Sequence, residues 1–152
     1  KKQRKKEEAM QEYLLVDGYN VIFAWESLTE LAKTNLDAAK DKLISLLSNY
    51  QGITGVKTLL VFDGYKVKGN HGSTTVQEDI EIVHTKENQT ADQFIEAHTH
   101  ENEGQYQMTV ATSDGLIQTI TRGAGCQIIS SRELYSAMEA AAKELREMYD
   151  IK

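Results

Sequence analysis

Residues 13–20 read Tyr13-Leu14-Leu15-Val16-Asp17-Gly18-Tyr19-Asn20, a short apolar run followed at once by an aspartate and a glycine. An apolar run of this length, bounded by a turn signal, predicts a buried strand over Tyr13–Val16 and a turn after it. The same arrangement recurs at Thr58–Phe62, which is followed by Asp63 and Gly64. Both predicted strands therefore end at an acidic residue.

Apolar runs alternate with amphipathic stretches along the rest of the chain. Further strands are predicted at Ile80–His84, Met108–Ala111 and Cys126–Ile129. Helices are predicted over Leu36–Tyr50, from Thr90 onward, over Gly115–Thr121, and from Ser130 or Ser131 through Met148. The polar, glycine-bearing residues 64–79 are typical of a mobile loop. Strands that alternate with helices predict an α/β fold, with a mostly parallel sheet of about five strands covered by helices on both faces.

The composition is that of one ordinary globular domain. The chain has 152 residues, of which 40% are hydrophobic and 26% charged, so it can bury a substantial core. No apolar run is long enough to cross a bilayer. The single cysteine, Cys126, excludes an internal disulfide framework and a thiolate zinc site, and it suits a reducing cytoplasm. We therefore expect a cytoplasmic protein without a membrane segment.

The charge is unevenly distributed. The formal net charge is −6, and the first eight residues carry five basic and two acidic side chains, which leaves a net charge of −9 on the remainder. We expect residues 1–12 to form a basic linker or helical lead, and residues 13–152 to form the domain. A domain this acidic is no general binder of polyanions, so contacts with nucleic acid must be local, or another molecule must deliver the substrate.

Acidic residues follow several predicted strands. In a parallel sheet the carboxyl ends of the strands meet at one edge, which is where ligands bind in such folds. Taken singly, each aspartate is better explained as a helix cap or a turn residue. Taken together, they favour one shared site for Mg²⁺ or Mn²⁺, which prefer carboxylate oxygens and would relieve the repulsion among them. The candidate metal ligands are Asp17, Asp63, Asp92, Asp114 and Glu96, the last being four residues after Asp92 on the same helix face.

Other polar and aromatic residues surround this predicted edge. Asn20 can cap the first helix or orient a ligand, and Thr112 and Ser113 can bond a phosphate or their own turn. Tyr19, Phe23 and Trp25 can stack on bases, although Phe23 is better explained as core. The four histidines have no metal-ligand spacing and are interpreted as surface or packing residues. The candidates for RNA binding are Lys66, Lys68, Lys86, Ser113, Arg122 and Arg132.

Several motifs together resemble the YacP-like group of NYN domains, within the PIN-like superfamily. They cover roughly residues 13–146 in order. They are Asp17-Gly18-Tyr19-Asn20 with Ala24-Trp25, Val61-Phe62-Asp63-Gly64, Lys66-Val67-Lys68-Gly69, Thr85-Lys86-Glu87, Thr90-Ala91-Asp92-Gln93-Phe94-Ile95-Glu96, Val110-Ala111-Thr112-Ser113-Asp114-Gly115 and Ser131-Arg132-Glu133-Leu134.

The resemblance implies a three-layer PIN-like fold and divalent-metal-dependent cleavage of RNA. It implies that Asp17, Asp92 and Asp114 are the central catalytic and metal-binding carboxylates, supported by Asn20 and Asp63. In the closest group the implied substrate is messenger RNA in the ribosomal A site, so RNA and the ribosome are the expected partners. The ribosome would then supply most of the contacts with RNA, which is consistent with the negative net charge of the domain.

Two other interpretations are open from the sequence. The chain can be a PIN-like module that docks on the ribosome or on RNA without cutting, including the C-terminal domain of a larger translation-factor-like protein. It can also be a receiver-like phosphoryl-transfer domain, which uses aspartates at strand ends. The receiver-like interpretation ranks low, because Gly18 stands where a second acid beside Asp17 is needed and no suitable lysine follows the fifth strand.

Overall fold

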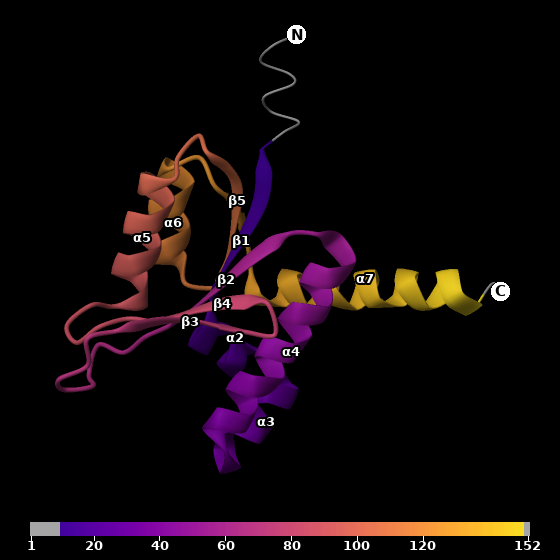
Figure 1. The fold of residues 1–152 in the computed structure, drawn as a ribbon, viewed down its shortest axis with the longest axis horizontal. Coiled ribbons are helices and arrows are strands. Elements are labelled where there is room, and N and C mark those ends of the chain that lie inside the picture. Colours follow the sequence, from indigo (N-terminus) through magenta and orange to yellow (C-terminus); the bar gives the residue numbers. More distant parts are fainter. Residues whose placement is uncertain (1–9, 151–152) are drawn as a thin grey trace, which may run out of the picture.

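A computed structural model describes residues 10–150 of the chain. It has an α/β fold in three layers, with one six-stranded sheet between two groups of helices (Figure 1). The strands are β1 (Gln11–Asp17), β2 (Lys57–Phe62), β3 (Ser73–Gln77), β4 (Ile80–His84), β5 (Tyr106–Ala111) and β6 (Gln127–Ile129). The helices are α2 (Gly18–Ala24), α3 (Glu26–Thr34), α4 (Leu36–Thr54), α5 (Ala91–Glu101), α6 (Gly115–Gly123) and α7 (Ser131–Asp150).

The strand order places β1 in the middle of the sheet. The order is β3-β4-β2-β1-β5-β6, and every neighbouring pair is parallel except β3 with β4. From β1 the chain first builds outward through β2 and β4, and later returns to the other side of β1 through β5. The reversal of strand order therefore lies between β1 and β5, where folds of this kind form a crevice at the carboxyl ends of the strands.

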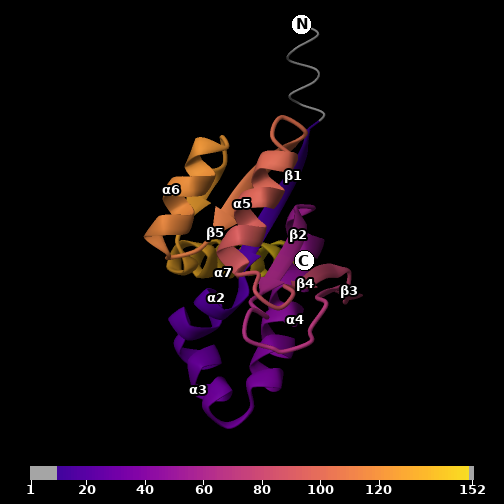
Figure 2. The same cartoon turned by 90° about the vertical axis from the view of Figure 1, so that its left-hand side faces the viewer.

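Two hydrophobic cores cover the two faces of the sheet. On one face Leu14 and Val16 of β1 pack with α2, α3, α4 and α7. On the other face Tyr13 and Leu15 pack with α5 and α6, which lie together on one side of the strands in both views (Figures 1 and 2). Because side chains alternate along a strand, Asp17 falls on the same face as Leu15, toward α5 and α6.

The turns after β1 and β2 both need their glycines. A Cβ on Gly18 would lie 2.5 Å from a ring carbon of Phe62 and 2.9 Å from the Val61 carbonyl oxygen. A Cβ on Gly64 would lie 2.1 Å from the Thr85 carbonyl oxygen. Each Asp-Gly pair thus lets the chain leave its strand in close contact with the neighbouring one, with the aspartate held at the strand end.

The predicted strands and helices all occur, and three further elements had no predicted range: α3, β3 and α2, which was expected only as a first helix that Asn20 could cap. No prediction covered α3, although its Leu28, Leu31 and Ala32 lie at helical spacing and pack on one core. The strand β3 lies inside residues 64–79, so the expectation of a mobile loop there is wrong for its second half. Glu78 and Asp79 adopt positive φ angles of 51° and 65° and close a tight hairpin, which pairs β3 with β4.

The expected linker or helical lead over residues 1–12 lies mostly outside the described residues. Within them, β1 already begins at Gln11, two residues before the predicted strand. No helix in residues 10–150 combines the length and the hydropathy that a membrane span requires.

Candidate functional site

Four aspartates come together at the carboxyl edge of the sheet, on the face covered by α5 and α6. Asp17 ends β1, Asp63 follows β2, Asp114 precedes α6, and Asp92 lies in the first turn of α5. The charges of Asp92, Asp114 and Asp63 all act on Asp17. The parallel register brings these ends to one edge, since β1 pairs with both β2 and β5. We call these four side chains the carboxylate cluster.

Asp17 is the most deeply placed member of the carboxylate cluster. Its side chain is buried, and burial together with the charges of Asp92, Asp114 and Asp63 raises its pKa to about 6. A hydrogen bond donated by the Thr112 hydroxyl to Asp17 Oδ2, at 3.0 Å, acts in the opposite direction. Although Asp17 stands at the N-cap position of α2, its side chain makes no capping bond. Capping therefore does not explain this aspartate.

Asp92 is only partly explained by local structure: it lies in the first turn of α5, where the helix dipole favours a carboxylate, and a backbone hydrogen bond at Asp92 lowers its pKa. Thr90 caps α5, in a capping box with Gln93, so the helix start is satisfied without Asp92. Partial burial and the charges of Asp114 and Asp63 raise the pKa of Asp92. Its carboxylate faces other carboxylates, which disfavours the ionised form.

Asp63 and Asp114 each have a local structural role as well. Asp63 accepts hydrogen bonds from the backbone N–H of Tyr65 at 2.8 Å and of Ala91 at 3.3 Å, which ties the end of β2 to the start of α5. Asp114 caps α6 by accepting from the backbone N–H of Leu116 at 2.9 Å. For these two, the capping and turn interpretation holds alongside any role in the site.

Glu96 lies one turn after Asp92 on α5, and its side chain is exposed. The carboxylates that raise the pKa values of Asp17 and Asp92 are all aspartates of the carboxylate cluster. Of the predicted ligands, Glu96 has the least structural support.

Thr112 links two members of the carboxylate cluster. Its hydroxyl donates to Asp17 Oδ2 and accepts from the backbone N–H of Asp114 at 3.0 Å. Thr112 is buried, and its own carbonyl accepts from the Gln118 side chain at 2.8 Å. This residue therefore sets the position of the turn after β5 against β1, a role beyond the turn bonding that the sequence suggested.

Asn20 lies within α2 and does not cap it, so the capping interpretation is wrong. Its Oδ1 accepts from the backbone N–H of Ser113 and from the Ser131 hydroxyl, both at 2.8 Å. Ser113 Oγ in turn accepts from the backbone N–H of Ser131 at 3.2 Å. Asn20 thus joins the segments that follow β1, β5 and β6, and is a positioning residue in this geometry. Ser131 was missed, because from the sequence it looked only like a helix cap; the capping bonds are in fact made by Ser130.

The predicted basic residues separate into two groups. Lys66, Lys68 and Lys86 are exposed on the loops after β2 and β4, at the same edge as the carboxylate cluster, and Arg132 is exposed at the start of α7. Arg122 lies in the last turn of α6, which carries it to the opposite edge of the sheet. Its predicted place near the other candidates is therefore wrong, because the helix turns away from the carboxyl edge.

The loop that carries Lys66 and Lys68 is held by several hydrogen bonds. The Asn70 side chain donates to the Thr85 carbonyl at 2.8 Å, and the Gly64 N–H donates to the Thr85 hydroxyl at 2.8 Å. The backbone N–H of Asn88 donates to the Tyr65 carbonyl at 3.0 Å. The two lysine-bearing loops are therefore fastened to each other rather than free.

The aromatic residues near the site are placed differently from expectation. Trp25 is buried, and its Nε1 donates to the Ser131 carbonyl at 2.7 Å. Phe23, interpreted as core, is 59% exposed, and its ring stacks on Tyr19. Phe23 is therefore available at the surface, whereas Trp25 is not. Among the histidines, His84 stacks on Phe62 and His98 on Phe94, as packing residues do.

A divalent cation fits the carboxylate cluster in charge and in donor chemistry. Only carboxylates, and no cation, appear among the charges that act on Asp17, and carboxylate oxygens are what Mg²⁺ and Mn²⁺ prefer. Within residues 10–150, however, no three acidic, histidine or cysteine side chains already stand in positions that could hold an ion together. Binding would therefore draw the carboxylates closer than they stand here.

Comparison with known proteins gives a consistent result. The model of the YacP-like NYN domain matches residues 14–152. The uncharacterized protein YacP of Bacillus subtilis is 39% identical over 133 residues, covering 87% of this chain and 78% of the relative. The crystal structure of B. subtilis Rae1 (YacP) superposes with a TM-score of 0.76 at 38% identity, covering 93% of this chain and 82% of that one. Its W164L mutant gives a TM-score of 0.76 at 36% identity, with coverages of 90% and 80%.

The match spans nearly the whole chain, and the solved relatives share the arrangement of sheet and helices described above. The chain therefore belongs to the YacP-like NYN domain family.

Proposed function

We propose that this domain is a divalent-metal-dependent endoribonuclease. The observation that carries the proposal is the buried Asp17 carboxylate, whose pKa is raised to about 6 by burial and by three further aspartates that converge on it from separate elements. Carboxylates that lie this close together destabilise a fold unless a positive charge compensates them. A cluster of aspartates with no cationic side chain among them therefore indicates a site that binds a cation. Membership in a family of nuclease domains supports the same conclusion.

Asp17, Asp92 and Asp114 would hold the cation, with Asp63 beside them and Glu96 the weakest candidate. When bound, a divalent cation neutralises the negative charge that develops on the phosphate during cleavage and lowers the pKa of water. Thr112 fixes the orientation of Asp17, and Asn20 holds the Ser113 turn against the start of α7. The exposed Lys66, Lys68, Lys86 and Arg132 flank the carboxylate cluster and would bind the RNA backbone, with Ser113 adding a polar contact.

The substrate we propose is messenger RNA presented in the ribosomal A site. The net charge, −6 for the chain and −9 without its first eight residues, makes the domain a poor binder of free RNA by itself, and a ribosome would supply the missing contacts. A cytoplasmic location follows from that partner.

The decisive experiment compares ribosome-bound with naked messenger RNA, using wild type and Asp92→Asn, with Mn²⁺ or with excess chelator. We expect cleavage by the wild type with Mn²⁺, at least about a hundredfold slower cleavage by Asp92→Asn, and none in chelator. Asp79→Asn is the matched control, since Asp79 lies in the β3–β4 turn at the other edge and its φ of 65° suits asparagine. Full activity of Asp92→Asn or in chelator would defeat the proposal.

A non-cleaving docking module is the second candidate, and one observation favours it. The carboxylates are not preassembled into a coordinating set within residues 10–150. A pure docking domain would bind ribosomes equally well as wild type and as Asp92→Asn, and would cut RNA under none of the conditions above. Site-specific binding of Mn²⁺ that Asp92→Asn abolishes would count against it.

A further inference from the structure

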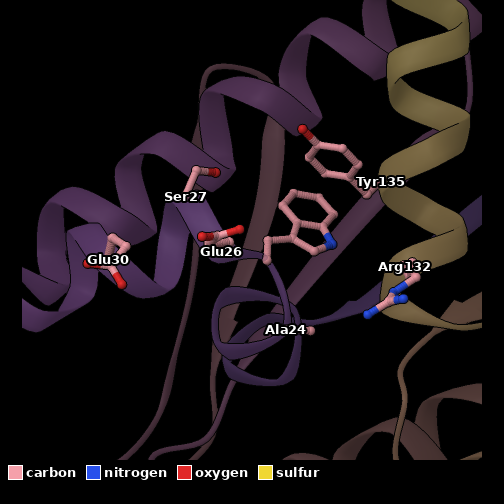
Figure 3. A pocket seen from close by; sticks show the side chains of 7 residues that line it. Ala24, Glu26, Ser27, Glu30, Arg132 and Tyr135 are labelled. Carbon is pink, nitrogen blue, oxygen red and sulfur yellow. The ribbon is translucent and has the colours of Figure 1, made fainter.

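A pocket of about 590 Å³ lies between α3 and α7 (Figure 3), in the helix layer on the face of the sheet opposite to α5 and α6. Its lining includes Trp25, Glu26, Ser27, Glu30, Arg132 and Tyr135. None of the roles assigned above uses this pocket as such, although Arg132 at its mouth is one of the proposed RNA contacts.

The pocket is directly connected to the residues that position the site. Trp25 Nε1 donates to the Ser131 carbonyl at 2.7 Å, and the Ser131 hydroxyl donates to Asn20 Oδ1 at 2.8 Å. Arg132 follows Ser131 in the chain. A polymer that crosses the carboxylate cluster and continues past Ser113 along the start of α7 would therefore be led toward this pocket.

The walls of the pocket combine an aromatic surface with two opposite charges. Tyr135 is 39% exposed, and its ring meets the buried Trp25 indole edge to face, with centroids 5.2 Å apart. In Figure 3, Glu26 on α3 and Arg132 on α7 lie on opposite sides of the pocket. An exposed phenol ring held rigidly by a second aromatic is a suitable platform for a base.

Glu26 and Arg132 are the charges that a ligand can use. Glu30, one turn after Glu26 on α3, is already paired with Lys33 at 2.9 Å. Neither Glu26 nor Arg132 takes part in an ion pair with another described residue. The pocket thus offers an acceptor carboxylate at one side and a cation suited to phosphate at the other.

We propose that this pocket binds one unpaired guanine base of the RNA that crosses the carboxylate cluster; this inference rests on the proposed function. Guanine alone presents two adjacent donors, N1–H and N2–H, on its Watson–Crick edge, and these match the two oxygens of Glu26. Adenine, cytosine and uracil place a lone-pair acceptor beside their donor, which a carboxylate repels. Tyr135 stacks on the base, and Arg132 contacts the adjoining phosphate.

Trp25 makes the test direct, because it is the only tryptophan in the chain and lines the pocket. The fluorescence of Trp25 is titrated with guanosine 3′-monophosphate, and separately with the adenosine, cytidine and uridine 3′-monophosphates, in excess chelator. We expect quenching by all ligands that bind and an affinity for the guanosine nucleotide at least about fivefold tighter than for the others. Equal affinities for the four nucleotides, or no binding, would overturn the proposal.

Substitutions assign the contacts. Glu26→Gln should reduce the preference for guanosine by about fivefold or more, whereas Glu30→Gln, the same change one turn away, should leave it intact.

Tyr135→Ala should weaken binding by about fivefold or more and Tyr135→Phe should not, since the ring is what stacks. Because Tyr135 touches Trp25, affinities are read from the titration midpoint and not from its amplitude. Arg132→Gln should weaken all four nucleotides alike. An unchanged preference in Glu26→Gln, or an equal loss in Glu30→Gln, would contradict the assignment of Glu26.

The outcome separates this inference from the proposed function. The titration contains no metal and measures no cleavage. Cleavage of RNA by the wild type without any nucleotide preference in the titration would overturn the guanine pocket alone. A guanosine preference that depends on Glu26, in a chain that cuts no RNA, would overturn the nuclease proposal and leave the pocket standing.

Discussion

Asp17 and Asp92 differ from the other two aspartates of the carboxylate cluster in what they contribute to the fold. Asp63 and Asp114 satisfy backbone N–H groups at helix starts and turns, so each offsets its own electrostatic cost locally. Asp17 makes no capping bond, and Thr90 rather than Asp92 caps α5. The pKa values of Asp17 and Asp92 are raised although a hydrogen bond from Thr112 to Asp17 and a backbone hydrogen bond at Asp92 act in the opposite direction, so part of the electrostatic cost is retained, as expected at a functional site.

Asp17→Asn should stabilise the metal-free protein at neutral pH. The pKa of Asp17 rises from 3.8 to about 6 on folding, so its contribution to stability is fully present below about pH 4 and is lost as pH rises through 6. The ionised carboxylate then costs up to about 3 kcal/mol. Asparagine removes the charge and keeps an oxygen for the Thr112 hydroxyl.

The measurement is urea unfolding of wild type and Asp17→Asn in excess chelator, at about pH 4 and about pH 7.5. We expect the variant to gain free energy of unfolding at the higher pH and to match the wild type at the lower. A variant that is less stable than wild type at neutral pH would show that repulsion among the carboxylates does not control the stability of this site.

At the scale of the elements, the close packing of strand ends depends on Gly18. Gly18→Ala would place a Cβ 2.5 Å from the Phe62 ring and 2.9 Å from a backbone oxygen, so α2 or β2 must shift. We expect a loss of about 1–3 kcal/mol in the free energy of unfolding, measured by chemical denaturation. Gly52→Ala, in the exposed last part of α4 with no atom near its new Cβ, should instead stabilise by about 0.5–1 kcal/mol. A neutral Gly18→Ala would mean that this turn is less tightly packed than described.

The contact between β1 and the end of β5 depends on the Thr112 hydroxyl. Thr112→Val keeps the shape but removes the bonds to Asp17 Oδ2 and to the Asp114 N–H. We expect about a tenfold loss of Mn²⁺ affinity, measured by calorimetry, because partners that orient ligands typically contribute this much. Thr58→Val, a buried threonine at the start of β2 whose hydroxyl donates to the Val56 carbonyl, is the matched control and should bind Mn²⁺ like wild type. Equal Mn²⁺ affinities of wild type and Thr112→Val would show that Thr112 does not orient a metal ligand.

At the scale of the whole molecule, the carboxylate cluster should link metal binding to stability. A ligand that binds only the folded state stabilises it by about 2.7 kcal/mol at one hundred times its dissociation constant. We therefore expect Mn²⁺ to raise the melting temperature of the wild type and of Asp79→Asn, and to leave that of Asp92→Asn nearly unchanged. Thermal unfolding with and without Mn²⁺ measures this shift. An equal shift in Asp92→Asn would place the bound cation elsewhere.

The sequence by itself determined the alternation of strands and helices and the presence of acids at strand ends. These properties are local: an apolar run stopped by Asp-Gly at Asp17 and Asp63 specifies a buried strand and a turn, and the Thr90–Gln93 capping box specifies the start of α5. The family motifs could also be found from the sequence, because they are contiguous. The short strand β3 was missed, because its burial pattern is exposed throughout and it forms only by pairing with β4.

Only the tertiary structure decided which acids face each other and what the neighbouring side chains do. Asn20 looked like a cap and instead joins Ser113 to Ser131, which is 111 residues away in the chain. Arg122 looked like an edge residue and is carried away by α6, while Trp25 is buried against α7 beside a pocket. Such relations depend on the strand order β4-β2-β1-β5-β6, which brings distant segments to one edge. Local pattern cannot encode them, because side-chain contacts between remote segments arise from packing and not from spacing along the chain.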